Sequence, residues 1–521
     1  MNIVCDICVR RVVRGVGVFV CVGVWMVAAV SAQGQETAAP VVNTFTAGFA
    51  EADITPAIGM EAPGGYGKSY HQVVHDPCKL RVAVFGDGSQ RVAIVGVDAI
   101  GVHGEMVREV RAQIEKQCGI PPQCVMVAAS HSHSSGPLYG VLPGSYDDAS
   151  ELVRKLAYEQ STCVNKQYYD DVLQKLVATV CQADAARAPA VGGAGKGIED
   201  KVAFNRRFRM RNGLSFTHPG QGNPDIVEPA GPTDPEVGVI GVWNEQGKMT
   251  GCIVNFACHA TTSPGGISAN YIYYLEQVVR GAFGPDVVVV FVPGTSGDVT
   301  QVDNLNPVLN PAGEDWARLV GGRVGAEAVK VLLTVARGNL GPVQASHTVL
   351  DIVRRAPTPE RLQKSLELVQ QTPEQVGHAD WTFAKEVVML DAILKKTPRV
   401  NAEVQVVQVG PVVLCGLPAE VFCQYGLTLK ASSKFPFTFP VSFANDDVGY
   451  IPTLEAFGEN GGGYETRITS YTNLDITAGN QMVDAALKLV ETLTPGPLPQ
   501  RPPHPAFGGP WDYGNVAPQV H

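Results

Sequence analysis

Four apolar runs in this chain each end in residues that can bind a ligand, and this recurrence is the feature that most restricts the fold. The first run, 124–129, leads to His131 and His133. The other three have the same form: 252–258 ends at His259, 286–292 leads to Asp298 and Thr300, and 412–419 ends at Glu420. Short apolar runs bounded by turn residues are typical of buried strands. Because open α/β sheets bind ligands beyond the carboxyl ends of their strands, the pattern predicts one shared site.

His131 and His133 lie two residues apart, so in an extended segment both imidazoles face the same side. Imidazole is the commonest metal ligand and titrates near neutral pH, so one ring can bind a metal while the other handles a proton. Two histidines and one carboxylate, here His131, His259 and Glu420, form an acceptable catalytic zinc set with a position open for water. The alternative is that the paired histidines are turn residues that bond only to the backbone.

The periodicity of apolar residues predicts an α/β fold, with a mixed β-sheet core flanked by helices and a metal site at the C-terminal ends of strands. Strands are expected at 46–53, 79–86, 90–97, 124–129, 237–243, 250–257, 286–292 and 344–353, and a hairpin at 402–408 and 411–417. Helices are expected at 103–117, 149–160, 166–186, 271–283, 314–337 and 479–493, with a charged helical segment at 358–397. The glycine-rich residues 190–200 predict a loop. The sequence has no recognisable internal repeat.

The composition is that of a globular protein with a large core. Hydrophobic residues make up 45% of the 521 residues and charged residues 17%, which excludes a disordered chain. The net charge is -10, and no basic stripe runs along the sequence, so nucleic acid is not an expected partner.

The two ends of the chain differ in composition from the rest. Three arginines precede an apolar stretch at 16–30, and small residues that match a cleavage site follow it. We therefore expect residues 1–32 to be a signal peptide, 33–45 a linker, and the mature protein to be exported to the periplasm or the extracellular space. An uncleaved membrane anchor is the alternative, although about fifteen apolar residues are few for a span. Residues 496–521 form a tail rich in Pro and Gly.

Nine of the twelve cysteines lie beyond the expected signal peptide. Nine is an odd number, so at least one thiol stays unpaired or pairs between chains. Two disulfides are candidates from proximity in the sequence, Cys118 with Cys124 and Cys163 with Cys181.

Six motifs, in order along residues 46–495, resemble those of the neutral/alkaline, non-lysosomal ceramidase family. They are Ala47-Gly-Phe-Ala-Glu-Ala-Asp53-Ile-Thr-Pro56, Ser130-His-Ser-His-Ser-Ser-Gly-Pro137, Asn255-Phe-Ala-Cys-His259, Gly297-Asp-Val-Thr300, Leu417-Pro-Ala-Glu420, and Asn445-Asp-Asp-Val-Gly-Tyr450-Ile-Pro-Thr followed by Gly-Gly-Tyr464-Glu. The resemblance implies that residues 46–495 form a catalytic domain like that of this family.

The resemblance also implies a role for each matched residue. The implied zinc ligands are His131, His259, Glu420 and Tyr450, and the implied catalytic residues around the scissile amide are His133, Arg206, Tyr464 and Thr300. Thr300 stands where the family motif has serine; it keeps the hydroxyl and adds a methyl group. Each residue could instead have no role in a site. In that case Glu420 is an acid near the start of a helix, Arg206 is solvated like Arg207, and the two tyrosines are surface residues.

Three functions follow as hypotheses. The first is a zinc-dependent hydrolase that cleaves the amide bond of a ceramide-like N-acyl substrate, with zinc activating water near neutral pH. The second is a zinc hydrolase of the same fold that acts on another amide or ester, such as an N-acyl sugar. The third is a secreted binding protein without catalysis. The expected partner is a small-molecule or lipid substrate, with transient contact with a membrane surface, and no nucleic acid.

Overall fold

The computed structural model describes residues 45–501, 508–509, 513 and 516–521. The expected signal peptide 1–32, nearly all of the expected linker 33–45, and part of the tail 496–521 lie outside the described residues. The described residues from 45 onward belong to one compact unit. Among them, no helix is both long and apolar enough to cross a membrane.

The described elements confirm the mixed α/β prediction. The strands are β1 Thr46–Asp53, β2 Lys79–Gly86, β3 Arg91–Val97, β4 Val125–Ala129, β5 Ala188–Ile198, β6 Phe204–Asn205, β7 Arg207–Met210, β8 Ser215–Thr217, β9 Ile226–Pro229, β10 Glu236–Asn244, β11 Met249–Phe256, β12 Val288–Pro293, β13 Val299–Thr300, β14 Val343–Val353, β15 Arg399–Val409, β16 Val412–Gly416, β17 Glu420–Val421, β18 Phe437–Val441 and β19 Tyr450–Ile451. The helices are α1 Gly104–Cys118, α2 Glu151–Tyr158, α3 Lys166–Ala185, α4 Tyr271–Phe283, α5 Glu314–Leu332, α6 Pro359–Leu368, α7 Pro373–Val376, α8 His378–Lys396, α9 Cys423–Ser432 and α10 Ala478–Thr492, with short 3-10 turns at η1 Pro122–Cys124, η2 Leu454–Phe457 and η3 Tyr464–Thr466.

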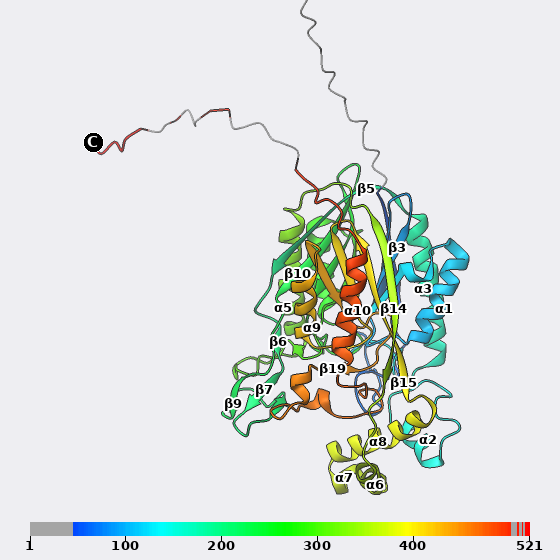
Figure 1. The fold of residues 1–521 in the computed structure, drawn as a ribbon. Helices are drawn as coiled ribbons and strands as arrows, with labels where there is room; N and C mark the ends of the chain where they lie inside the picture. Colours follow the sequence, from blue (N-terminus) through cyan, green and yellow to red (C-terminus); the bar gives the residue numbers. More distant parts are fainter. Residues whose placement is uncertain (1–44, 502–507, 510–512, 514–515) are drawn as a thin grey trace, which may run out of the picture. The chain divides into compact units, whose positions relative to one another are not determined.

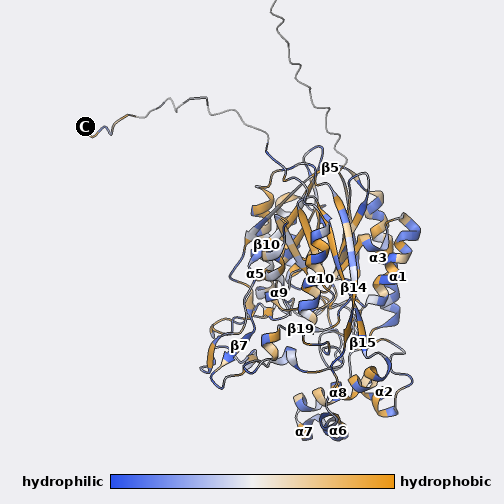
Figure 2. Cartoon of the chain, in the orientation of Figure 1, coloured by the Kyte–Doolittle hydropathy of each residue, from blue (hydrophilic) through white to orange (hydrophobic). Residues whose placement is uncertain are grey.

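An eight-stranded sheet forms the centre of the fold, in the order β12-β11-β10-β5-β1-β2-β3-β4. Figure 1 labels three of its strands, β3, β5 and β10. Strands β3 and β4 are parallel, as are β11 and β12, and the other neighbours are antiparallel. A second sheet, β14-β15-β16-β18, contains the predicted hairpin, in which Val409 pairs with Val412. Figure 2 shows apolar strands inside and polar residues on the outer helices, as expected for a buried sheet.

The two halves of the central sheet have the same connectivity, which the sequence did not reveal. One half runs β1-β2-β3-α1-β4, the other β5-β10-β11-α4-β12, and each consists of three antiparallel strands, a helix and a parallel strand. The two halves pack so closely at Gly96 of β3 that a side chain would not fit there. A Cβ atom on this glycine would lie 2.4 Å from the carbonyl oxygen of Phe291 in β12. Both parallel strands therefore end near one another, which brings distant motifs together.

The prediction of a loop at 190–200 was wrong, because this segment is most of strand β5. Its glycines allow close packing of helix α5: a Cβ on Gly195 would lie 2.7 Å from Val331, and one on Gly197 would lie 2.0 Å from Glu327. Glycine in a strand often marks such a close approach, and here it hid the alternating pattern of apolar residues.

Both candidate disulfides were wrong, because all nine cysteines in the described part of the chain are free. Cys181 of α3 instead lies near Cys118 at the end of α1, since these two helices pack together; burial, followed by the neighbouring Cys118 thiol, raises the pKa of Cys181 to about 12. Proximity along the sequence therefore predicted the wrong neighbours, because the packing of α1 on α3 determines which cysteines are close.

Candidate active site

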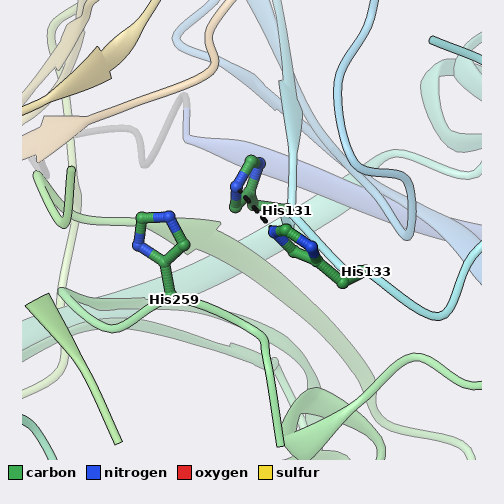
Figure 3. A group of neighbouring side chains, drawn as sticks. All are labelled: His131, His133 and His259. Atoms are coloured by element: carbon green, nitrogen blue, oxygen red, sulfur yellow. Dashed lines mark hydrogen bonds between the residues drawn. The ribbon is translucent and has the colours of Figure 1, made fainter. Parts of the chain in front are cut away.

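Three histidines from two distant motifs meet at the carboxyl ends of the strands, as the sequence predicted (Figure 3). His131 and His133 follow β4, and His259 follows β11. Their donor nitrogens all lie within 4.8 Å of one another, and the Nε2 atoms of His131 and His133 are 3.2 Å apart. The two chain segments converge because the halves of the sheet pack against each other.

The two buried imidazoles are oriented by backbone carbonyls. Nδ1 of His131 bonds to the carbonyl oxygen of Ile100 at 2.7 Å, and Nδ1 of His259 bonds to that of Ser296 at 2.6 Å. A carbonyl can only accept, so Nδ1 carries the hydrogen and Nε2 presents its lone pair to the centre of the group. A hydrogen bond from the ring nitrogen that does not face the metal to a backbone carbonyl is typical of metal-binding histidines.

The backbone at His131 is strained. His131 has a φ of 61°, and Phe443, whose ring stacks on the imidazole at a centroid distance of 4.0 Å, has a φ of 54°. Residues other than glycine pay for this left-handed conformation, and such strain clusters at functional sites. The His131 ring lies 4.8 Å from each of the other two histidine rings, measured between centroids.

Glu420 closes the group from a separate strand. Its Oε2 atom lies 3.1 Å from Nε2 of His259 and 3.4 Å from Nε2 of His131. Burial opposes ionisation of Glu420, but the neighbouring imidazoles outweigh it and lower the pKa of the carboxyl. The contacts of Glu420 are therefore with the two histidines, which the alternative of an acid near the start of a helix does not explain. Parallel pairing of β17 with β19 places Tyr450 directly opposite Glu420.

Burial and neighbouring charges favour the neutral form of two of the imidazoles, the form that can bind a metal. Burial, followed by the charge of Arg206, lowers the pKa of His259 to about 4, and burial followed by the charge of His131 lowers that of His133 well below its ordinary value. Both rings are therefore neutral at pH 7 and keep a lone pair. Neutral imidazoles together with the Glu420 carboxylate are a donor set that fits a divalent transition metal.

Arg206 is buried beside the histidines and not solvated. Its Nε donates to Glu465 at 2.7 Å, one terminal nitrogen donates to the carbonyl of Gly297 at 2.9 Å, and the other lies 3.3 Å from Nε2 of His259. The guanidinium also sits 5.3 Å from the centroid of the Tyr450 ring. The neighbouring Arg207, expected to be solvated, is buried as well.

Tyr450 and Tyr464 lie inside the site and not on the surface. Their rings are 5.4 Å apart, and the Tyr450 ring is nearly parallel to that of His259, with centroids 6.4 Å apart. The Tyr464 hydroxyl also meets two phenols that sequence reasoning missed, those of Tyr66 and Tyr471. Tyr66 stands in a glycine-rich turn, which is the one signal that could have drawn attention to it.

Thr300 lies next to this group in the chain, but its hydroxyl is engaged elsewhere. The hydroxyl accepts a hydrogen bond from the backbone nitrogen of Val302, whereas the carbonyl of the preceding Val299 accepts one from the backbone nitrogen of His259. Asp298 of the same motif has a supporting position instead: one carboxylate oxygen accepts from the backbone of Cys423 and the other from the side chain of Asn205. The motif thus connects the loop after β12 with Cys423 and with Asn205, the residue before Arg206.

A cavity of about 670 Å³ is lined by His131, His133 and Glu420. Residues of helix α8 also line it. Its apolar lining includes Ile100, Val141, Leu142, Met389, Ile393 and Val448, and its charged lining includes Arg108, Arg354, Glu386 and Lys396. The cavity can therefore take a molecule with both an apolar chain and polar groups.

No family model and no curated protein matches this sequence. Solved structures do resemble it, two ceramidases among them. Neutral ceramidase from Pseudomonas aeruginosa superposes with a TM-score of 0.63 at 20% identity, covering 88% of this chain and 76% of that one. The chain has the neutral ceramidase fold. A ceramidase complexed with C2 matches with a TM-score of 0.62 at 19% identity, covering 88% and 77% of the two chains. The ceramidase fold thus accounts for most of this chain, in agreement with the resemblance of its motifs.

Proposed function

We propose that this protein is a zinc-dependent amidohydrolase that cleaves a ceramide-like N-acyl substrate into a fatty acid and a sphingoid base. The observation that carries the proposal is a single cavity whose lining combines His131, His133 and Glu420 with apolar side chains. The likeness to solved ceramidases supports the same substrate class. A chain of methylenes suits the apolar lining, because burying each CH₂ group contributes about 0.8 kcal/mol.

The proposed zinc ligands are His131, His259, Glu420 and Tyr450. His131, His259 and Glu420 are the three protein donors that are usual for catalytic zinc, and an open position remains for water. Tyr450 would be a fourth protein ligand in a five-coordinate site, because it stacks with His259 at a centroid distance of 6.4 Å and stands opposite Glu420 in the β17–β19 pair. A zinc ion bound there would polarise a water molecule and the substrate carbonyl.

The other side chains would handle the substrate and its protons. Neutral His133 is suited to accept a proton from the attacking water and to return it to the leaving amine. Tyr464 and Arg206 are suited to donate hydrogen bonds to the carbonyl oxygen as negative charge develops on it. We assign Thr300 no contact with the substrate, because its hydroxyl bonds to the backbone of Val302.

A panel of N-acyl substrates, assayed with and without a chelator, tests the proposal. We expect release of fatty acid from a short-chain ceramide, loss of that activity with chelator, and its return with added zinc. Release from N-acyl sugars or esters but not from any ceramide would refute the lipid assignment and keep the metal hydrolase. Binding of N-acyl lipids without any hydrolysis would refute catalysis and favour the binding protein.

We also propose that the protein is exported, on the basis of the composition of residues 1–32. Mass spectrometry of protein from the native host should find a mature N-terminus near Gln33. A full-length chain in the cytoplasm would contradict this.

A further inference from the structure

Three tyrosine hydroxyls form a closed ring of hydrogen bonds at the edge of the candidate site. The hydroxyls of Tyr464 and Tyr471 are 2.7 Å apart, those of Tyr66 and Tyr471 are 2.8 Å apart, and Tyr66 donates to Tyr464 at 3.2 Å. All three residues line the cavity. Tyr464 and Tyr471 are 7 residues apart, whereas Tyr66 lies 398 residues before Tyr464, so only the tertiary structure completes the ring.

Helix α8 anchors both of the tyrosines that flank Tyr464. The buried ammonium of Lys385 donates to the backbone carbonyl of Tyr66, and the carboxylate of Glu386 accepts from both the backbone nitrogen and the hydroxyl of Ser470, the residue before Tyr471. Phe383, on the same helix, packs on the rings of Tyr66 and Tyr464 with centroid distances of 5.5 and 6.4 Å. Consecutive residues of one helix thus hold both flanking tyrosines.

A phenol carries only one hydrogen, which limits what Tyr464 can do inside the ring. In the closed ring with Tyr66 donating to Tyr464, the Tyr464 hydrogen is directed to Tyr471. If Tyr464 turns its hydrogen toward the cavity, Tyr66 can still donate to its oxygen and Tyr471 can donate to Tyr66. The ring then becomes a chain of donors ending at Tyr464, and each bond in such a chain polarises the next.

We propose that Tyr66 and Tyr471 are positioning residues that hold the Tyr464 hydroxyl and support it when it donates to the reacting carbonyl. This inference rests on the proposed function, in which Tyr464 is that donor. Burial raises the pKa of all three phenols, so each keeps its hydrogen at neutral pH. Neither flanking tyrosine belongs to the motifs that resemble the ceramidase family.

Kinetics of Tyr66→Phe and Tyr471→Phe on a short-chain ceramide test the inference. Each change should lower kcat about tenfold, the usual worth of one hydrogen bond, and alter KM by less than about twofold. In a Tyr464→Phe background the same changes should lower kcat by less than about twofold more, because their effect passes through Tyr464. Fully additive losses, or kcat equal to that of the wild type in both single variants, would overturn the inference.

Tyr425→Phe is the matched control. Tyr425 is a buried tyrosine whose hydroxyl bonds to Asn480, and it is not among the residues that line the cavity. It should keep the kcat of the wild type, and melting curves of all variants identify any loss of folding.

A measurement without substrate separates this inference from the proposed function. With tyrosine labelled by ¹³C at Cζ, the Tyr464 signal should shift in Tyr66→Phe and Tyr471→Phe and stay in place in Tyr425→Phe. If the wild type hydrolyses no N-acyl substrate, the proposed function fails, while an unmoved Tyr464 signal in both variants overturns the ring itself.

Discussion

The two sides of the candidate site are built in different ways. On the histidine side, His131 and His259 follow core strands directly, and each ring is oriented by one backbone carbonyl. On the tyrosine side, Tyr66, Tyr464 and Tyr471 come from loops and 3-10 turns, and their hydroxyls are held mainly by one another. Core strands therefore position the donors that could hold a metal, whereas side-chain contacts between loops position the groups that would meet the substrate.

The largest effect should come from the histidine side. His259→Ala removes a donor nitrogen, so bound zinc should fall below about a tenth of an equivalent. Activity should decrease at least about 10³-fold as a result. The fold should persist, because the side chain lies beyond the end of β11 and the apolar strand is unchanged. Elemental analysis, N-acyl hydrolysis and circular dichroism measure the three quantities.

His347→Ala, in an exposed position on β14, is the control and should change neither metal nor activity. Full zinc occupancy in His259→Ala would contradict the assignment of the histidine side as the metal site.

His133 belongs either to the metal ligands on the histidine side or to the groups that act on the substrate, and a substitution can distinguish the two roles. If His133 transfers protons and is not a ligand, His133→Ala should keep zinc and lower kcat by ~10²–10⁴-fold. Its Nε2 atom is close enough to that of His131 for either role. Loss of zinc from the variant, measured by elemental analysis, would move His133 into the ligand set.

The tyrosine side depends on a buried carboxylate for its stability. Glu465 accepts from Arg206 at 2.7 Å and from Thr217 at 2.7 Å, and its side chain is 0% exposed. Glu465→Gln leaves the buried guanidinium without its countercharge, so the free energy of unfolding should fall by about 3–5 kcal/mol.

Glu455→Gln provides the control, because Glu455 pairs with Arg209 with 70% of its side chain exposed and should cost about 0–1 kcal/mol. Urea unfolding compares the two variants. Equal losses would mean that the buried pair does not hold the tyrosine side together.

The smallest effect should come from the anchor on α8. Lys385→Met leaves the carbonyls of Tyr66 and Gln160 and the Ser161 hydroxyl without their donor, and should lower the free energy of unfolding by about 1–3 kcal/mol. Lys395→Met on the same helix removes only an exposed pair with Asp391 and should cost about 0.5 kcal/mol or less. Urea unfolding measures both, and a loss of metal in Lys385→Met would show that the two sides are not independent.

The sequence was a good guide to regular elements and a poor one to glycine-rich and short ones. Helix α4 begins and ends at the predicted residues, and the hairpin of β15 and β16 forms as expected. Strand β5 was missed because its glycines serve close packing against α5, a contact between segments that local patterns cannot show. The free thiol pair Cys118 and Cys181 was missed for the same reason.

The histidine side could be located from the sequence because its donors sit at the ends of apolar strands, and burial of those strands is a local, periodic signal. The motifs of His131, His259 and Glu420 therefore predicted one site before any contact was known. Only the tertiary structure decided which carbonyl orients each imidazole and that Arg206 is buried. It alone brought Tyr66 and Tyr471 to Tyr464, because loops carry no periodic pattern and their hydroxyls meet only after the sheets and α8 have packed.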